Sequence, residues 1–517
     1  MKKGNRKENK LYQNASIVTG LSIAERALGF LYRIVLSRFI GSEGVGLYQV
    51  ALSHFFLLHT IGAGGIPTTV SRLIARKNAE GKSSENSKTV GAGLSLSLFL
   101  TLPICLILMF FGQSFSSIFS DERVVDLLKI LLLVLPFSCL FEVIRASFWG
   151  EKQFLVPALL EMAEEIITVL AGTILLLTLS KQSDFTVFVG AKSATSALAI
   201  AYAFSFVCAI LCFVCSKRKI ANPRSQLMPL LASALPITAV RTGASLVNSA
   251  IAVLFPAALT RIGYTYAQAM QSYGVLTGMA MPVLFIPITL ISGLSLVLMP
   301  ELSGDFYAKN YPKLLLNIRR GMACAVLLSC ALIPLLFTLG KDMGGLLYAN
   351  PLSGKLISAG CFLLFPMSIA MISTSVLNSI GKEKYTFVFY FIGASGMILL
   401  MTMLAPVLKE YAYLAALFFN FTLTAVCNVL LLKRTLKALS PNDDCTILPK
   451  QITLSAAIGA GVLCALGTLA GGWFSTIFGT IVSPLATAGL LILCGAGWYF
   501  AFIFVPRKTK TKFCGKN

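Results

Sequence analysis

Two arginines within the first long apolar stretch have the types and spacing that could do chemistry. Residues 11–41 predict a membrane-spanning helix, yet the stretch contains Arg26 and Arg33. An arginine near the bilayer centre costs about 2.5–3.5 kcal/mol on insertion scales. The seven-residue spacing places both side chains on one helix face, about 10 Å apart along the axis. A guanidinium stays protonated and binds two phosphate oxygens at once. The pair therefore predicts either structural ion pairs or a site for an anionic substrate.

Carboxylates also occur inside the predicted spans. Glu161, Glu164 and Glu165 occupy one to two turns of a single helix, and three such groups cannot all be ionised cheaply at low dielectric. They either neutralise basic residues of neighbouring helices, which is the expected arrangement, or take up H⁺ or Na⁺ as a coupling ion. Glu25 adjoins Arg26 but points about 100° away on the helix, so its partner stays open.

Two further features complete the candidate set. Glu142 and Arg145 are three residues apart and predict a structural ion pair, whereas Arg241, near the middle of another span, is a further candidate for anion binding. No catalytic motif or cofactor fingerprint is present, and the cysteines lack the partner pattern of a metal site, so we expect no enzyme, no catalytic residues, no cofactor and no metal.

The elements that must position these residues are membrane helices. Of 517 residues, 56% are apolar and only 12% are charged, whereas a soluble domain carries about 25% charge. Apolar stretches of about 20 residues or more cross a bilayer as α-helices. We predict an all-α polytopic membrane protein with fourteen spans, at about residues 14–40, 46–70, 89–112, 127–149, 154–179, 186–214, 228–259, 270–299, 321–340, 355–380, 385–407, 411–432, 451–474 and 480–505.

The distribution of basic residues predicts the orientation. With the N-terminus inside, 30 of the 43 Lys and Arg residues fall in predicted inside segments, 8 fall in outside segments or at the outer ends of spans, and 5 lie deeper within spans. Because basic residues concentrate on the cytoplasmic side, both termini are predicted to be cytoplasmic in a multi-pass protein of the cell membrane. The N-terminal apolar run lacks a small-residue cleavage site, so we expect it to remain as an anchor. The net charge of +22 suits the anionic inner leaflet, and nucleic acid is not an expected partner.

A weak internal repeat predicts two lobes. The sequence LSRFIG at 36–41 has a counterpart, LTRIG, at 259–263, and LPFS at 135–138 has one, FPMS, at 365–368. Each counterpart lies six predicted helices after its motif, so the repeat unit is six helices. Because six is even, the copies have the same orientation and are related by a pseudo-two-fold along the membrane normal.

The repeat divides the chain into three predicted domains. These are an N-terminal six-helix lobe at 1–224, a C-terminal six-helix lobe at 225–440, and a two-helix pair with a basic cytoplasmic tail at 441–517. Two lobes facing a central cavity are typical of an alternating-access transporter. Apart from Lys355, at the first residue of its span, all the charges inside the predicted spans lie before residue 245, so one wall of such a cavity is expected to be charged.

Three segments resemble a known family. They are NASIVTGLSIAERALGFLYRIVLSRFIGSEGVGLYQVA at 14–51, GGIPTTVSRLIAR at 64–76 and MPVLFIPITLISGLSLVLMPELS at 281–303. They look like the polysaccharide-transporter branch of the multidrug/oligosaccharidyl-lipid/polysaccharide (MOP) exporter superfamily. Within it the chain most resembles the stage V sporulation protein B group, which is related to the lipid II flippases.

The resemblance implies a function and carries over particular residues. It implies a flippase that moves an undecaprenyl-diphosphate-linked saccharide, for peptidoglycan or polysaccharide assembly and in this group for the spore cortex, from the inner to the outer leaflet. In the lipid II flippases, arginines of the first, second and eighth helices line the cavity. This implies a diphosphate site at Arg26, Arg33 and Arg72, which follows Pro67. The eighth span here has no interior arginine, a departure for which Arg241 is the expected substitute.

Two other functions stay open at this stage. A cation-coupled drug or cation antiporter of the same fold would use the glutamates of the fifth span, although the arginines argue against it. A non-transporting scaffold that recruits cell-wall synthesis proteins is the third reading, and the short loops argue against that. The expected partners are a lipid-linked oligosaccharide, the bilayer, Na⁺ or H⁺ as the coupling ion, and cell-wall synthesis proteins.

Overall fold

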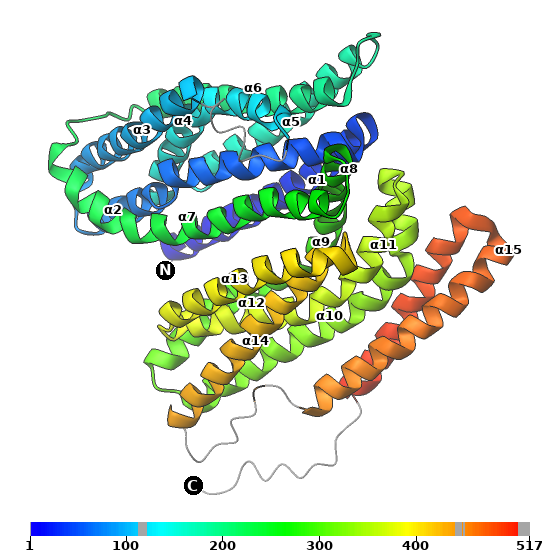
Figure 1. The fold of residues 1–517 in the computed structure, drawn as a ribbon. Coiled ribbons are helices and arrows are strands. Elements are labelled where there is room, and N and C mark those ends of the chain that lie inside the picture. The colour runs from blue at the N-terminus through cyan, green and yellow to red at the C-terminus, as the bar shows by residue number, and fades with distance from the viewer. Residues whose placement is uncertain (1, 112–120, 440–446, 448–449, 505–517) are drawn as a thin grey trace, which may run out of the picture. The chain divides into compact units, whose positions relative to one another are not determined.

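The structure is a computed structural model that describes residues 2–111, 121–439, 447 and 450–504, and helices make up nearly all of this part (Figure 1). The predicted basic tail beyond residue 504 lies outside the described residues. The helices are α1 (Lys2–Ala63), α2 (Ile66–Ala79), η1 (Ser83–Glu85), α3 (Asn86–Phe111), α4 (Arg123–Gly150), α5 (Leu155–Leu179), α6 (Val187–Cys215), α7 (Arg224–Arg261), α8 (Tyr266–Gly274), the π-helical turn η3 (Val275–Ala280), α9 (Met281–Tyr307), α10 (Tyr311–Tyr348), α11 (Pro351–Gly360), η4 (Cys361–Leu363), α12 (Leu364–Ser379), α13 (Glu383–Leu408), α14 (Tyr411–Leu439) and α15 (Lys450–Phe504).

The helices confirm an all-α, multi-pass membrane protein. Within the described ranges, 12 helical stretches are long and apolar enough to cross a membrane. The first of them, Ile17–Ala79, is 63 residues long and turns at Gly41, so it contains two of the predicted spans. A shorter apolar helix, Pro484–Ala496, corresponds to the last predicted span. The fourteen predicted helices are thereby accounted for.

The chain forms two compact units, and each has its own packed interior. Unit 1 takes the described residues of 1–279 and 401–410, and unit 2 takes those of 280–400 and 411–517. In unit 1, α2, α3, α4 and the start of α7 share an apolar core around Ile66, Val70, Ile74 and Phe148. The units follow different limits from the predicted domains, because α7 and α8 pack within unit 1. The domain boundaries near 224 and 440 therefore stay predictions.

Helix α1 changes direction where glycine permits it. Gly41 has φ 65° and ψ −176°, a conformation that side chains with a Cβ disfavour, and it ends the first span where the sequence predicted. The second span was predicted to run to residue 70, but α1 ends at Ala63 and α2 begins at Ile66. The sequence Gly64-Gly65, followed by Pro67 in the first turn of α2, explains this break, because proline suits a helix start and disfavours a helix interior.

The predicted internal repeat is visible in the backbone. Left-handed residues occur at equivalent turns of the two copies: Gly41 in the first copy corresponds to Gly263 in the second, and Gly81 corresponds to Lys309. Around the latter pair the hydrogen bonds also match. The amide of Lys82 donates to Lys77, five residues back, and that of Asn310 donates to Asp305. The two copies therefore end their helices by the same local geometry.

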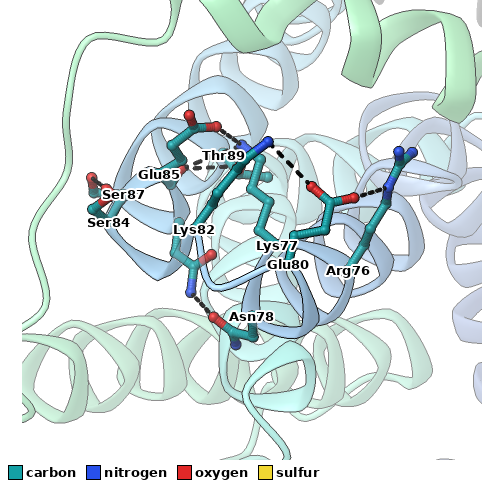
Figure 2. Close-up of polar contacts among 10 residues, drawn as sticks. Arg76, Lys77, Asn78, Glu80, Lys82, Ser84, Glu85, Ser87 and Thr89 are labelled. Carbon is teal, nitrogen blue, oxygen red and sulfur yellow. Dashed lines mark hydrogen bonds and ion pairs between the residues drawn. The ribbon is translucent and has the colours of Figure 1, made fainter.

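The turn between α2 and α3 is closed by a buried lysine (Figure 2). Lys77 is only 8% exposed, and its Nζ donates to Thr89 Oγ1 at 2.8 Å and lies 3.3 Å from Glu85 Oε2. The exposed Arg76–Glu80 pair lies beside it, and the Arg76 guanidinium holds the pKa of the Glu80 carboxyl below its usual range. We call Lys77, Glu85 and Thr89 the first turn clamp.

The second copy carries the same clamp with the charges exchanged. In the repeat, Asp305, Lys313 and Asn317 are equivalent to Lys77, Glu85 and Thr89 in that order. Asp305 is 7% exposed and accepts from Lys313 Nζ at 3.1 Å and from Asn317 Nδ2 at 3.0 Å. An acid thus stands where the first copy has a base, and a base where it has an acid. This shows that the turn accommodates either polarity, provided that the buried charge is paired.

The clamps lead to a charge-swap prediction. Lys77→Asp places like charges together in the first turn clamp and should cost about 2–3 kcal/mol of stability, because a charged hydrogen bond is lost. Adding Glu85→Lys should recover most of the loss. Thermal unfolding in detergent measures both variants, with Arg76→Ala as the matched control, since an exposed pair contributes only about 0–1 kcal/mol. A double variant as unstable as the single one would contradict the equivalence of the clamps.

Candidate functional site

Helix α1 presents Arg26 and Arg33 at the edge of its buried face. Both side chains are exposed, whereas Tyr32 is only 4% exposed and packs against Gly172 of α5. One turn earlier, a Cβ on Gly29 would lie 2.8 Å from Glu165 Oε1, so α1 and α5 are in close contact there. The two arginines lie on one face of α1, as their spacing predicts. That face is beside the contact with α5 and not part of it.

Within the residues that the structure describes, the two arginines have no close counter-ion. In the described part of the chain, neither Arg26 nor Arg33 forms an ion pair within 4.0 Å. Arg33 interacts electrostatically with Glu165 and with Tyr48 at longer range, and Arg26 does so with the adjacent Glu25. Their guanidinium donors are therefore available to an added anion.

The other two predicted arginines lie near the break between α1 and α2. Arg72 is exposed on α2, just over one helix turn beyond Pro67. Arg241, on α7, donates from Nη1 to the carbonyl of Gly64 at 2.6 Å, and Thr238 Oγ1 accepts from the amide of Gly65 at 3.0 Å. Helix α7 thus satisfies backbone groups that the break leaves unpaired. Arg241 has a structural task that the sequence did not indicate, while its side chain as a whole is exposed.

The segment that precedes α7 also contacts α3 and α4 of the same unit. Arg218 donates from Nη2 to Glu151 Oε2 at 2.7 Å, and its guanidinium lies 3.7 Å from the ring centroid of Phe148. The amide of Ala221 donates to the carbonyl of Ser87. Sequence reasoning assigned this basic segment only to membrane orientation, and no signal in the sequence indicated these contacts.

The glutamates of α5 fall into two groups. Glu161 pairs with Arg145 of α4, which also donates from Nη2 to Glu142 at 2.7 and 2.8 Å. The predicted Glu142–Arg145 pair is therefore confirmed, and one guanidinium serves two carboxylates. Glu164 and Glu165 are half-buried and form no ion pair within the described ranges. Tyr202 of α6, which sequence reasoning missed, interacts electrostatically with Glu164.

The structure gathers all the predicted site residues in unit 1. Helices α1, α2 and α7, which carry the four arginines, contact one another, and α5 contacts α1. One group of residues offers exposed guanidinium donors, suited to phosphate oxygens, and the other offers half-buried carboxylates, suited to a proton or a small cation. The first group matches the chemistry of an anion site, and the second that of charge balance or ion coupling.

Comparisons with known proteins agree with this fold. A family model described as "Polysaccharide biosynthesis protein" matches residues 11–304. Stage V sporulation protein B of Bacillus subtilis (strain 168) is 25% identical over 65% of this chain and 66% of its own length, just under two thirds of that relative. The lipid II flippase MurJ of the same organism is 21% identical over 80% of this chain and 82% of its own length.

Solved structures share the fold at low sequence identity. A structure of the lipid II flippase MurJ in an inward closed conformation has a TM-score of 0.70 and 16% identity, and covers 94% of this chain and 99% of that one. An inward-facing multidrug resistance MATE family transporter of the MOP superfamily has a TM-score of 0.69 and 15% identity, and covers 81% of this chain and 96% of that one.

Proposed function

Because this chain belongs to the polysaccharide biosynthesis protein family, we propose that it is a flippase for an undecaprenyl-diphosphate-linked saccharide. The substrate is a lipid II-like peptidoglycan or polysaccharide precursor, including that of the spore cortex, and it moves from the inner to the outer leaflet by alternating access. The relatives named as a lipid II flippase and as a stage V sporulation protein support this assignment.

The observation that carries the proposal is the pair of exposed arginines on α1. Two guanidinium groups in an apolar helix cost several kcal/mol unless they meet water, a resident carboxylate or a ligand. Arg26 and Arg33 are exposed and lack an ion pair among the described residues. A diphosphate suits them, because each guanidinium fork binds two oxygens and the charges are complementary. Arg72 and the unused donors of Arg241 are further contacts in this proposal.

Membrane potential supplies a driving force for this direction. With both termini in the cytoplasm, as the 30 inside and 8 outside basic residues favour, export moves negative charge outward across an inside-negative membrane. Each charge gains about 2.3 kcal/mol per 100 mV. The potential alone therefore favours export, and H⁺ or Na⁺ bound by Glu25, Glu164 or Glu165 is the alternative source of coupling.

A second function is favoured by one observation, the excess of carboxylates over bases around Arg145. An antiporter for drugs or cations would use Glu164, which has no ion pair in the part of the chain that the structure describes. Purified protein in liposomes separates the two functions. A flippase exposes an added lipid-diphosphate saccharide in the opposite leaflet, whereas an antiporter shows cation-coupled efflux of a cationic dye and leaves the lipid in place.

A further inference from the structure

A carboxylate of α5 lies against α1 at the level between the two arginines of the proposed anion site. Gly29 is three residues after Arg26 and four before Arg33, which makes it the helical neighbour of both. A Cβ on Gly29 would lie 2.8 Å from Glu165 Oε1 and 3.5 Å from Glu165 Cδ. The glycine therefore leaves room on α1 for this carboxylate, about one helix turn from each arginine.

Glu165 is not committed to an ion pair of its own. Its side chain is half-buried and has no basic group within 4.0 Å in the part of the chain that the structure describes. At longer range Arg33 attracts it and Glu25 repels it. Glu164, by contrast, interacts with Arg145 of the ion-pair network. Two successive glutamates of α5 thus face different arginines, and Glu165 faces one that belongs to the proposed site.

A bound diphosphate would meet this carboxylate. Side chains three and four residues apart on a helix have Cβ atoms about 5–6 Å apart, so a diphosphate on Arg26 and Arg33 brings negative charge close to Glu165. Like charges repel strongly where water is scarce, and both anions attract the same guanidinium groups. A protein that passes a ligand across the membrane must bind it well enough to load it and weakly enough to release it.

We propose that Glu165 is the release residue of the anion site: its carboxylate competes with the diphosphate for Arg26 and Arg33 and limits how tightly the substrate binds. This inference rests on the proposed function, because it requires a diphosphate at these arginines. Glu165 acts through the arginines and does not itself touch the substrate. Removing its charge should therefore tighten binding and slow release.

Neutralising the carboxylate tests the competition directly. E165Q in detergent should bind farnesyl diphosphate about tenfold more tightly than the natural protein in isothermal titration calorimetry, because a like charge is removed at nearly constant volume. In liposomes, its KM for lipid-diphosphate saccharide and its maximal rate should both fall. E164Q is the matched control, and its affinity should stay close to that of the natural protein. An E165Q affinity that is unchanged or weaker would overturn the release role.

A methyl group at residue 29 should displace the carboxylate without removing its charge. Among the described residues, a Cβ there meets only the carboxyl group of Glu165, the end of a flexible side chain that can move aside. G29A should therefore bind farnesyl diphosphate about threefold more tightly. G20A is the control on the same helix, since a Cβ on Gly20 meets nothing within 4 Å.

Combining the two changes shows whether they act through one group. G29A/E165Q should bind no more tightly than E165Q alone, because the displaced charge is already absent. Gains that add in the double variant would overturn the competition. A purely structural role of Glu165 would lower the unfolding temperature and the transport rate without tightening binding, and would overturn it as well.

The same titrations distinguish failure of this inference from failure of the proposed function. If farnesyl diphosphate binding is lost in Arg33→Ala but unchanged in E165Q and G29A, the diphosphate site stands and the release role is rejected. If neither the natural protein nor E165Q binds farnesyl diphosphate, the diphosphate site and the release role are both rejected.

Discussion

Arg33→Ala and Arg26→Ala each abolish most translocation of a diphosphate-linked lipid while the protein remains folded: this is the result we expect. Each substitution removes a charged hydrogen-bond donor worth about 2–3 kcal/mol, which corresponds to roughly 30- to 150-fold weaker binding. Neither side chain holds an ion pair within the described residues, so removing it leaves no carboxylate stranded. Lipid translocation in liposomes gives the activity, and size-exclusion chromatography gives the folded fraction.

Two controls separate charge from geometry in this prediction. Arg33→Lys keeps the positive charge but loses the planar fork, so we expect it to retain an intermediate rate. Leu31→Ala changes another exposed residue of the same helix, 54% exposed, and should leave the rate nearly unchanged. Full activity of both alanine variants at Arg26 and Arg33 would reject the anion site on α1.

The second large effect is expected at Arg145. Arg145→Met leaves Glu142 and Glu161 without their shared guanidinium, beside the half-buried Glu164. Removing one partner of a largely buried ion pair costs about 3–5 kcal/mol, because the remaining charge stays desolvated. The variant should therefore unfold at a markedly lower temperature in detergent.

Neutralising the stranded acids should rescue this variant. Arg145→Met combined with Glu142→Gln and Glu161→Gln removes the charges together and should recover most of the lost stability. Arg123→Met provides a comparison at a more exposed arginine, 36% exposed, which pairs with Asp121 and Glu43. If Arg145→Met were as stable as the natural protein, the ion-pair network would have no role in holding α4 against α5.

Local sequence signals predicted the helices, the turn at Gly41 and the Glu142–Arg145 pair. Each depends on residues within one helix or one turn, where periodicity, glycine and a three-residue spacing act directly. The contact of Arg145 with Glu161 joins α4 and α5, so the spacing of residues within a single helix could not predict it. The break after Ala63 was not predicted, although its cause is also local, in Gly64, Gly65 and Pro67. Thr238 and Arg241 of α7 then bind the backbone groups that the break leaves unpaired.

The residue types of the candidate site were predictable from the sequence, but the contacts that each residue makes were not. Intramembrane charge singled out Arg26, Arg33 and Arg241, and the structure shows that Arg241 also holds the carbonyl of Gly64. The repeat visible in the sequence located the equivalent turns. It gave no sign of the contacts between helices, because these depend on tertiary packing.

One measurement tests the central claim most directly. Purified protein in liposomes is given two lipids with the same saccharide and tail, one with a diphosphate link and one with a neutral link, under an imposed potential. We expect the diphosphate lipid to cross at a rate that rises with the potential in the exporting direction and falls at least tenfold in Arg33→Ala, while the neutral lipid stays behind. Equal transfer of both lipids, or equal rates in the natural protein and Arg33→Ala, would contradict an arginine-based diphosphate site.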